Sequence, residues 1–324
     1  MGDGERGMGE DGRRPASSPL APRLSLPAIL LEAARPKTLP AAAAPVVLGS
    51  LVAWSLGGFH ALAAGCALAG ALLIQIGTNY VNDAEDALRG ADAAGRLGPR
   101  RATAAGLVSP GTMRRAAAGA FGLAFVAGLY LIARGGWPIL AVGLASIASG
   151  VAYTAGRHAL AYTGLADAFV LVFFGPVAVG GTVWVQALTL PPWVVVAGFA
   201  PGALATAILV ANNVRDAETD AAAGKRTLAV RFGRAFGLRL YTACISTAIA
   251  IPAAQAFYWR DHVGVLAASL VAALVGRRLA VRLARSVAEP PPAGADHPAN
   301  AVLAATGRLL FVYSVLYGLG VVLT

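Results

Sequence analysis

The chain has 324 residues, of which 57% are hydrophobic and only 13% are charged, and its formal net charge is +10. Because soluble domains carry about 25% charged residues, this composition excludes an ordinary soluble protein and indicates an integral membrane protein. The basic excess alone is compatible with nucleic-acid binding, so the positions of the basic residues have to decide that point.

The amino-terminal segment has no apolar core. Residues 1–24 carry charges, Gly and Pro throughout, so no cleavable signal peptide is expected there. We predict that residues 1–30 form a disordered tail and that residues 31–324 form one membrane domain. Cys66 and Cys244 lie in apolar runs without metal-type spacing, which argues against a disulfide framework or a zinc site.

Long apolar runs follow the tail. A helix needs about 20 apolar residues to cross a bilayer core, whereas the strands of a membrane barrel alternate over about ten. Helices also satisfy their own backbone groups in lipid. We therefore predict an all-α, multi-pass membrane protein with nine transmembrane helices bundled around a central cavity. The expected spans are 39–57, 61–82, 113–134, 137–154, 163–186, 193–214, 238–256, 263–282 and 301–323.

The basic residues support this topology. If the amino terminus is cytoplasmic, 24 of the 26 Lys and Arg lie in the tail, the even-numbered connections or the adjoining helix ends, and only Arg134 and Arg260 lie outside. This is the positive-inside pattern, and such residues also anchor helices to anionic lipid. We expect a protein of the cell membrane, with the bilayer and not a nucleic acid as its surroundings.

Two acidic runs stand at the inner ends of the second and sixth spans. They read NYVNDAEDALRGAD (79–92) and NNVRDAETD (212–220) and hold seven of the sixteen Asp and Glu residues. Carboxylates at a membrane boundary are costly and usually functional. One such cluster is explained as well by a solvated helix end, but two with matching spacing favour a shared site. Residues three or four apart share a helix face, which groups Asn82 with Asp83 and Asp86, and Asn212 with Asp216 and Asp220.

Opposed oxygen ligands of this kind suit magnesium, which combines carboxylates with water and substrate phosphates. Basic residues close to the runs could meet the phosphate oxygens; they are Arg89, Lys225 and Arg226, with Arg35, Lys37 and Arg157. A magnesium diphosphate site at the mouth of an apolar bundle indicates a substrate with a long apolar tail, such as a prenyl diphosphate. Tyr153 could offer its ring or hydroxyl to the allylic cation.

Two further segments bear on the site. The connection 90–113 is rich in Gly and Arg and too long for a simple turn, which favours a functional lid, with a disordered linker as the alternative. In the fifth span, FFGPVAVGGT (173–182) has the small residues and the proline that suit close helix packing or a bend.

At this point the motifs match a known family. The chain resembles the intramembrane prenyltransferases of the UbiA superfamily, which are nine-helix bundles with two magnesium-binding aspartate motifs on the cytoplasmic side. The first motif of that family is Asn, three residues, Asp, three residues, Asp; here Asn82, Asp86 and Gly90 fill it, and Asp92 comes two places later. In this departure the chain resembles one branch of the family, the 1,4-dihydroxy-2-naphthoate polyprenyltransferases of menaquinone synthesis. The resemblance covers most of residues 34–234, including ARPKTLPAAAAPVVLGS (34–50) and RLGPRRATAAGLVSP (96–110).

The resemblance implies roles for individual residues. Asn82, Asp86, Asp216 and Asp220 would hold magnesium, within a wider expected ligand set that adds Asp83, Asp92 and Asn212. Asp86, Asp216, Asp220 and Tyr153 are the expected catalytic residues. Arg157 stands where many relatives carry Lys, and Arg forms bidentate phosphate contacts where Lys acts as a point charge.

The implied reaction is magnesium-dependent transfer of a polyprenyl group to 1,4-dihydroxy-2-naphthoate, with loss of carbon dioxide and diphosphate. The residues leave two alternatives open. One is the same fold with another acceptor, for example 4-hydroxybenzoate, homogentisate, haem or a lipid. The other is a cation-coupled membrane transporter, against which both clusters lie at the inner face and Asp167 is the only other acidic residue near a span.

Overall fold

The computed structural model describes residues 24–90, 97–98, 100–156, 159–258, 260–289 and 296–323, which form helices joined by turns and loops, without a strand among them. Eight helical segments of this part are long and apolar enough to cross a membrane. They are Leu26–Ser55, Ala61–Leu88, Pro110–Gly135, Ala166–Ala187, Pro192–Arg215, Arg234–Tyr258, His262–Ala288 and Ala299–Val322. The prediction of an all-α membrane fold is confirmed.

The predicted count of nine spans is not confirmed, because the fourth expected span is a shorter apolar helix. α5 (Trp137–Ala152) has 16 residues, and at 1.5 Å per residue it is about 24 Å long, short of a bilayer core about 30 Å thick. Its start is set by Gly136, whose φ of 77° turns the chain sharply out of α4 (Pro110–Gly135). Only glycine adopts this conformation readily.

The predicted disordered tail extends too far. α1 (Leu26–Ala33) begins five residues before the expected boundary at residue 31, with Pro27 in its first turn, where a missing N–H costs nothing. Its apolar face is buried at Ile29 and Ala33, and the Tyr80 hydroxyl donates to the Leu30 carbonyl at 3.0 Å. Packing against the long helix α3 (Ala61–Leu88) therefore orders this segment, while residues 1–23 lie outside the described part.

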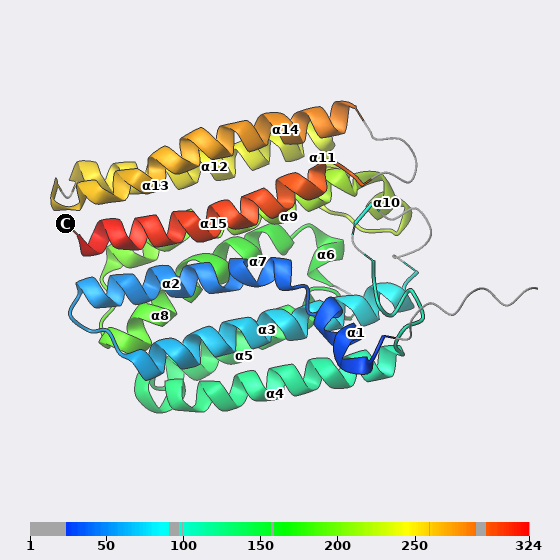
Figure 1. The fold of residues 1–324 in the computed structure, drawn as a ribbon, viewed down its shortest axis with the longest axis horizontal. Helices are drawn as coiled ribbons and strands as arrows, with labels where there is room; N and C mark the ends of the chain where they lie inside the picture. Colours follow the sequence, from blue (N-terminus) through cyan, green and yellow to red (C-terminus); the bar gives the residue numbers. More distant parts are fainter. Residues whose placement is uncertain are drawn as a thin grey trace, which may run out of the picture.

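The remaining elements follow in chain order. They are η1 (Pro36–Thr38), α2 (Leu39–Ser55), α3 (Ala61–Leu88), α6 (Leu160–Thr163), α7 (Ala166–Val172), η2 (Phe173–Val177), α8 (Ala178–Ala187), α9 (Pro192–Arg215), α10 (Ala217–Ala222), α11 (Leu228–Phe232), α12 (Arg234–Tyr258), η3 (Arg260–Val265), α13 (Leu266–Val271), η4 (Ala272–Gly276), α14 (Arg277–Ala288) and α15 (Ala299–Val322). The long helices run side by side, and the short elements α1, α6, α10 and α11 gather at one end, away from the carboxyl terminus (Figure 1).

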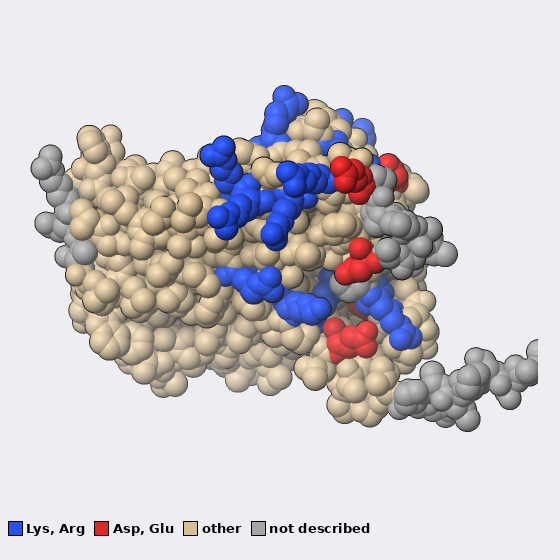
Figure 2. Space-filling view, turned by 45° about the horizontal axis from the view of Figure 1, so that its top comes forward, with Lys and Arg blue, Asp and Glu red and all other residues tan. Residues whose placement is uncertain are grey.

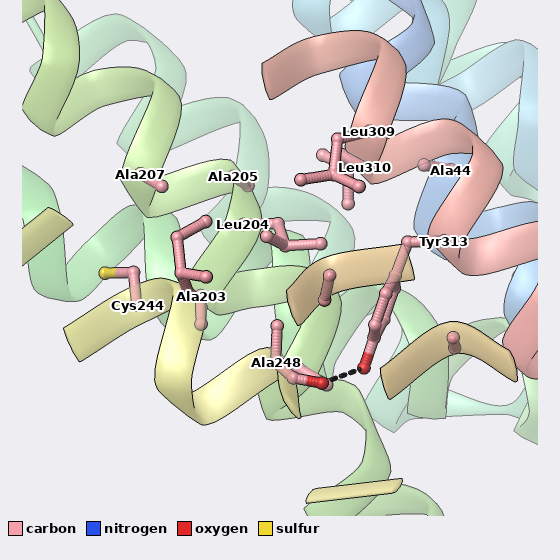
Figure 3. Close-up of a cluster of buried hydrophobic side chains, with 14 of the residues drawn as sticks. Ala44, Ala203, Leu204, Ala205, Ala207, Cys244, Ala248, Leu309, Leu310 and Tyr313 are labelled. Carbon is pink, nitrogen blue, oxygen red and sulfur yellow. Dashed lines mark hydrogen bonds between the residues drawn. The ribbon is translucent and has the colours of Figure 1, made fainter. Parts of the chain in front are cut away.

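The core is centred on α9, which buries 16 of its 24 residues. It packs on α12 and α15, and α15 packs on α2. Figure 3 shows Leu204 of α9 near Leu310 of α15, and Tyr313 donating from its hydroxyl to the Ala248 carbonyl of α12 at 2.7 Å. Since lipid is as apolar as these side chains, close packing and such interhelical hydrogen bonds hold the helices together.

The small residues of the fifth span serve the close packing and the bend expected of them. At Gly175, within the π-helical turn η2, the backbone leaves the helical region with φ −108° and ψ −112°. A Cβ atom at Gly175 would lie 2.8 Å from the Gly198 carbonyl oxygen, and one at Gly198 would lie 2.7 Å from the Pro176 Cα. The backbones of η2 and α9 approach this closely only because both positions are glycine.

Charged side chains collect toward the end of the bundle that carries α10. On the described part of the face in Figure 2, the acidic residues lie at that end, Lys and Arg extend from there toward the middle, and the opposite end shows no charged side chain. The two acidic runs, which are far apart in the sequence, therefore meet at one end of an apolar bundle.

Candidate active site

The inner end of α3 supplies the first acidic run. Asn79, Asn82, Asp83 and Asp86 are all buried there. They follow one another at intervals of three, one and three residues, so they lie on one side of the helix. The helix thus buries these Asn and Asp side chains within the protein, on the face where their spacing placed them.

Asp83 anchors the connection that follows α3. Its Oδ2 accepts from the Ala102 N–H at 3.1 Å, and its Oδ1 accepts from the Thr103 N–H at 2.8 Å. Hydrogen bonds from backbone N–H groups to a carboxylate are about twice as strong as neutral ones. The connection is thereby folded back over α3, which brings Arg101 to the first acidic run.

Asp86 has one oxygen paired and one open. Its Oδ2 accepts from Arg101 Nη2 at 3.1 Å and lies 3.8 Å from Lys225 Nζ. Its Oδ1 is buried and accepts no hydrogen bond from the described residues, although the side chain is only 2% exposed. A buried carboxylate oxygen left without a hydrogen-bond donor is costly. This oxygen is therefore available to bind a cation or to accept a further hydrogen bond.

The second acidic run stands where α9 ends and α10 begins. Arg215, which is 2% exposed, forms a bidentate pair with Asp216, with Nε 2.7 Å from Oδ1 and Nη2 2.6 Å from Oδ2. The same guanidinium donates to Asn212 Oδ1 at 2.7 Å and to Asn300 Oδ1 of α15. Both oxygens of Asp216 are therefore occupied by one buried arginine.

Lys225 joins the two runs. Its Nζ lies 3.5 Å from Asp220 Oδ1 and 3.8 Å from Asp86 Oδ2, and its backbone N–H donates to the Asp220 carbonyl at 2.8 Å. Burial raises the pKa of Asp220 to about 6, a rise that Lys225 opposes and that the neighbouring Asp216 and Asp86 increase. The prediction that both motifs face one another is thus supported at Asp86 and Asp220.

An apolar cavity of about 260 Å³ opens beside this cluster, between α2, α3, α4, α5, α7 and α8. Tyr153, which follows α5, lines its inner end, with Gln75 and Thr78 of α3 nearby in the lining. Burial raises the pKa of Tyr153 well above its ordinary value, and the carboxylates Asp167, Asp86 and Asp220 raise it further. A neutral tyrosine therefore stands between the cavity and the acidic cluster.

The predicted phosphate-binding residues are only partly brought together. The guanidinium of Arg89 lies 4.5 Å from the centre of the Tyr162 ring, and Lys225 Nζ lies 5.7 Å from the same ring. Arg35 is half-buried, and its positive charge acts to lower the pKa of Tyr153. Two others, Lys37 and Arg226, are exposed at the surface.

Two residues of the predicted set, Asp92 and Arg157, lie outside the described part of the chain. Their proposed roles as a metal ligand and a phosphate ligand remain predictions. Gly156, which directly precedes Arg157, is described: its carbonyl accepts a hydrogen bond from Arg89 Nη2.

The comparisons with known proteins bear on what this end of the bundle does. The sequence profile of the UbiA prenyltransferase family matches residues 42–294. This chain belongs to the UbiA prenyltransferase family. A 1,4-dihydroxy-2-naphthoate octaprenyltransferase of Mycobacterium tuberculosis is 44% identical over 220 residues, 66% of this chain and 73% of the relative. The protein of that name from Escherichia coli is 41% identical over 221 residues, 66% of this chain and 71% of the relative.

Solved structures of known proteins share the fold. A UbiA homolog from Archaeoglobus fulgidus bound to GPP and Mg²⁺ has a TM-score of 0.60 at 14% identity and covers 91% of this chain and 100% of its own. A digeranylgeranylglyceryl phosphate synthase has a TM-score of 0.57 at 14% identity, covering 91% and 98%. At such identities the likeness establishes the architecture of this UbiA protein, an apolar helical bundle in a membrane, and not its substrates.

Some site residues of this UbiA protein were missed by the sequence analysis. Arg101 and Arg215, which pair with Asp86 and Asp216, were not singled out, nor was Thr154, whose hydroxyl donates to Asn82 Oδ1 at 2.7 Å. A signal existed for Arg215, since it lies within the second run next to Asp216. None existed for Arg101, because its partner depends on how the connection folds.

The oxygen ligands of the two runs fit a magnesium ion only in part. Among the described residues, no three Asp, Glu, His or Cys side chains lie close enough to surround one metal ion, and Asp86, Asp216 and Asp220 each pair with an arginine or a lysine. Two features nevertheless fit a cation: the open Oδ1 of Asp86, and the ammonium group of Lys225 between Asp86 and Asp220. A cation is thus already accommodated between the two runs, and carboxylate oxygens are ligands that magnesium prefers.

Proposed function

We propose that this UbiA prenyltransferase transfers a polyprenyl group from its diphosphate to 1,4-dihydroxy-2-naphthoate, with loss of carbon dioxide and diphosphate, giving demethylmenaquinol for menaquinone synthesis. The observation that carries the proposal is the junction of Asp86 and Asp220 at Lys225 beside an apolar cavity. The relatives named 1,4-dihydroxy-2-naphthoate octaprenyltransferase, at 41–44% identity, support the acceptor.

We assign the metal to the oxygen ligands of the two runs. Asn82, Asp86, Asp216 and Asp220 would hold Mg²⁺, with Asp83, Asp92 and Asn212 in the surrounding set. When bound, the ion supplies Lewis-acid stabilisation of the charge on the departing diphosphate. The A. fulgidus homolog bound to GPP and Mg²⁺ supports a divalent ion in this fold.

The basic residues of the chain bind the diphosphate in this proposal. Lys225 lies within 4 Å of a carboxylate from each run, so it can exchange these partners for phosphate oxygens as the negative charge arrives. Arg89, stacked on Tyr162, adds a forked donor at the same end. The remaining proposed contacts are from Arg35, Lys37, Arg157 and Arg226.

The cavity holds the apolar part of the substrate. Its lining includes Phe125, Phe169, Phe173 and Phe174, and the polar side chains of Gln75, Thr78 and Tyr153 stand toward its inner end. When the bond between the prenyl carbon and the diphosphate oxygen breaks, both electrons leave with the diphosphate. Apolar walls then keep water from the allylic cation, and the ring face of Tyr153 stabilises its charge.

The positive-inside pattern supports placing the site at the cytoplasmic face of the cell membrane. There the water-soluble naphthoate reaches it from one side and the prenyl chain from the bilayer. The charged end of the bundle in Figure 2 corresponds to this face in the proposal.

The test is a direct assay on purified protein. It is incubated with Mg²⁺, a prenyl diphosphate and 1,4-dihydroxy-2-naphthoate, and mass spectrometry is used to detect the decarboxylated prenyl product, with a chelator as control. The expected result is product only when Mg²⁺ is present. Release of diphosphate without this product would mean that the acceptor is another compound, such as 4-hydroxybenzoate or homogentisate. If no diphosphate is released with any acceptor, the proposed prenyl transfer is wrong.

A further inference from the structure

Helix α7 separates two cavities. One face, with Phe169 and Val170, lines the apolar cavity of about 260 Å³. The other face, with Asp167 and Leu171, lines a second cavity of about 500 Å³ together with α9 and α12, which contribute Ala203, Thr206 and Ala243. We call this second cavity the α7–α12 groove. Its volume lies in the range of about 300–1,000 Å³ that is usual for small-molecule sites.

Asp167 is the acidic residue of the groove. Its side chain is only 6% exposed, and neither carboxylate oxygen accepts a hydrogen bond from the part of the chain that the structure describes. The two hydroxyls in the lining donate elsewhere: Thr206 Oγ1 to the Gly202 carbonyl at 2.9 Å, and Thr247 Oγ1 to the Ala243 carbonyl at 3.0 Å. The groove therefore offers a hydrogen-bond acceptor without a donor to match it.

Such a carboxylate is costly unless something satisfies it. Intramembrane Asp residues that have no protein partner generally face a ligand, an ion or a water-filled path. The walls of the groove are otherwise formed largely by Ala, Leu, Ile and Phe side chains, which favours a ligand with an apolar body over an ion. Ala243 at the rim is exposed on α12, so the groove opens toward the bilayer.

Charge distinguishes between the aromatic compounds of the proposed reaction. The acceptor carries a carboxylate, which Asp167 would repel, whereas the product has lost that carboxylate and carries an apolar chain. We propose that the α7–α12 groove binds the neutral prenylated aromatic diol released by the reaction, with one ring hydroxyl donating to Asp167. This inference rests on the proposed function, and it adds a second, lipid-facing site on the far side of α7.

The oxidation state of the ligand gives a sharp criterion. The diol and its quinone have nearly the same shape, but the quinone has no hydroxyl to donate. Because the groove contributes an acceptor, the diol binds more tightly than the quinone, and the naphthoate acceptor binds least.

The experiment measures binding and not turnover. Calorimetric titration of the full chain in detergent, with a chelator, a reductant and no prenyl diphosphate, uses 2-geranyl-1,4-naphthalenediol as the probe. Asp167→Leu removes the acceptor at similar volume, and Asp167→Asn retains a carbonyl oxygen. Ala243→Phe fills the rim without touching Asp167, and Ala250→Phe places the same ring on another exposed position of α12 as the matched control.

We expect at least a tenfold loss of diol affinity in Asp167→Leu and in Ala243→Phe, a smaller loss in Asp167→Asn, and none in Ala250→Phe, since a hydrogen bond to a charged group is worth about a factor of ten or more. Equal diol affinity in wild type, Asp167→Leu and Ala243→Phe would overturn the inference, as would equal affinity for diol and quinone. If Asp167→Leu fails to fold, Ala243→Phe and the diol-to-quinone ratio still decide.

This result is independent of the assay for prenyl transfer. If the groove variants lose diol binding but no transfer to the naphthoate is detected, the inference about the groove stands and the proposed acceptor is wrong. If prenyl transfer is detected but substitution of Asp167 does not change diol affinity, the proposed function stands and the inference about the groove is wrong.

Discussion

Asp86 of the first acidic run and Asp220 of the second lie within 4 Å of the same group, the ammonium nitrogen of Lys225, at 3.8 and 3.5 Å. This shared cation connects α3 to the segment after α10. Two buried carboxylates would repel one another without it. Lys225 therefore holds the site together before substrate binds, at the position where the proposed diphosphate and metal later bring their own charges.

Replacing Lys225 tests this position. We expect Lys225→Met to lower kcat/KM by about 10²-fold or more, the usual effect of removing one preorganised group that stabilises a leaving oxyanion, and Lys225→Arg to recover part of the rate. Arg239→Gln, at an exposed position of α12, is the control for loss of one positive charge. Similar kinetics in Lys225→Met and the control would show that Lys225 is not part of the site.

Much of the fold follows from the sequence, because the length of an apolar run determines whether a helix can span a bilayer. Helix spacing also predicted that Asn82 and Asp86 share a face. The partners of these residues could not be predicted in the same way. Spacing identifies the face of a helix but not what covers it, and Arg101 reaches Asp86 only because Asp83 binds the backbone at Ala102 and Thr103.

Helix ends were also harder to predict than helix centres. α5 begins directly after Gly136, where its span was expected to begin, but it ends at Ala152, two residues before the predicted end at residue 154. Hydropathy over a window of residues does not resolve a helix end this closely. α1 exists because its apolar face packs near Tyr80, a tertiary contact that composition does not contain. His60 caps the start of α3, with its Nδ1 accepting from the Ala63 N–H at 3.3 Å, and apolar runs give no sign of such a cap.

The buried pair of Arg215 and Asp216 predicts a large effect on stability. Asp216→Ala leaves a buried guanidinium without its bidentate partner, which costs about 3–5 kcal/mol in comparable pairs. We expect the double variant Arg215→Met and Asp216→Ala to recover most of the loss, since neither charge then remains. Thermal unfolding in detergent measures both. If the double variant is no more stable than Asp216→Ala, the pair is not the source of the effect.

Asp83 is predicted to act on the connection and not primarily on chemistry. Asp83→Ala removes two hydrogen bonds from the N–H groups of Ala102 and Thr103, so hydrogen exchange at these amides is expected to rise by about ten- to a hundredfold, as about 1.5–3 kcal/mol of protection is lost. Glu85→Gln is the control, because Glu85 pairs with Arg114 at 2.7 Å on the surface. Unchanged exchange in Asp83→Ala would show that other contacts hold the segment.

The pKa of Asp220 predicts how stability depends on pH in the metal-free protein. Burial raises this pKa from 3.8 to about 6, so between these values the folded state binds more protons than the unfolded state, and the contribution of Asp220 to stability falls as pH rises. Above about pH 6 the charged, desolvated form remains as a constant cost. Asp220→Asn removes that cost and should gain stability relative to wild type as pH rises from 4 to 6.

The measurement is the difference in unfolding temperature between wild type and Asp220→Asn, taken in chelator from pH 4 to pH 7. The same titration predicts that magnesium affinity falls below about pH 6, because a ligand carboxylate must lose its proton before it binds. Asp220→Asn should bind magnesium more weakly but lose this part of the pH dependence. A stability difference that stays constant across the range would show that Asp220 titrates at its ordinary pKa and is not desolvated at the junction with Asp86.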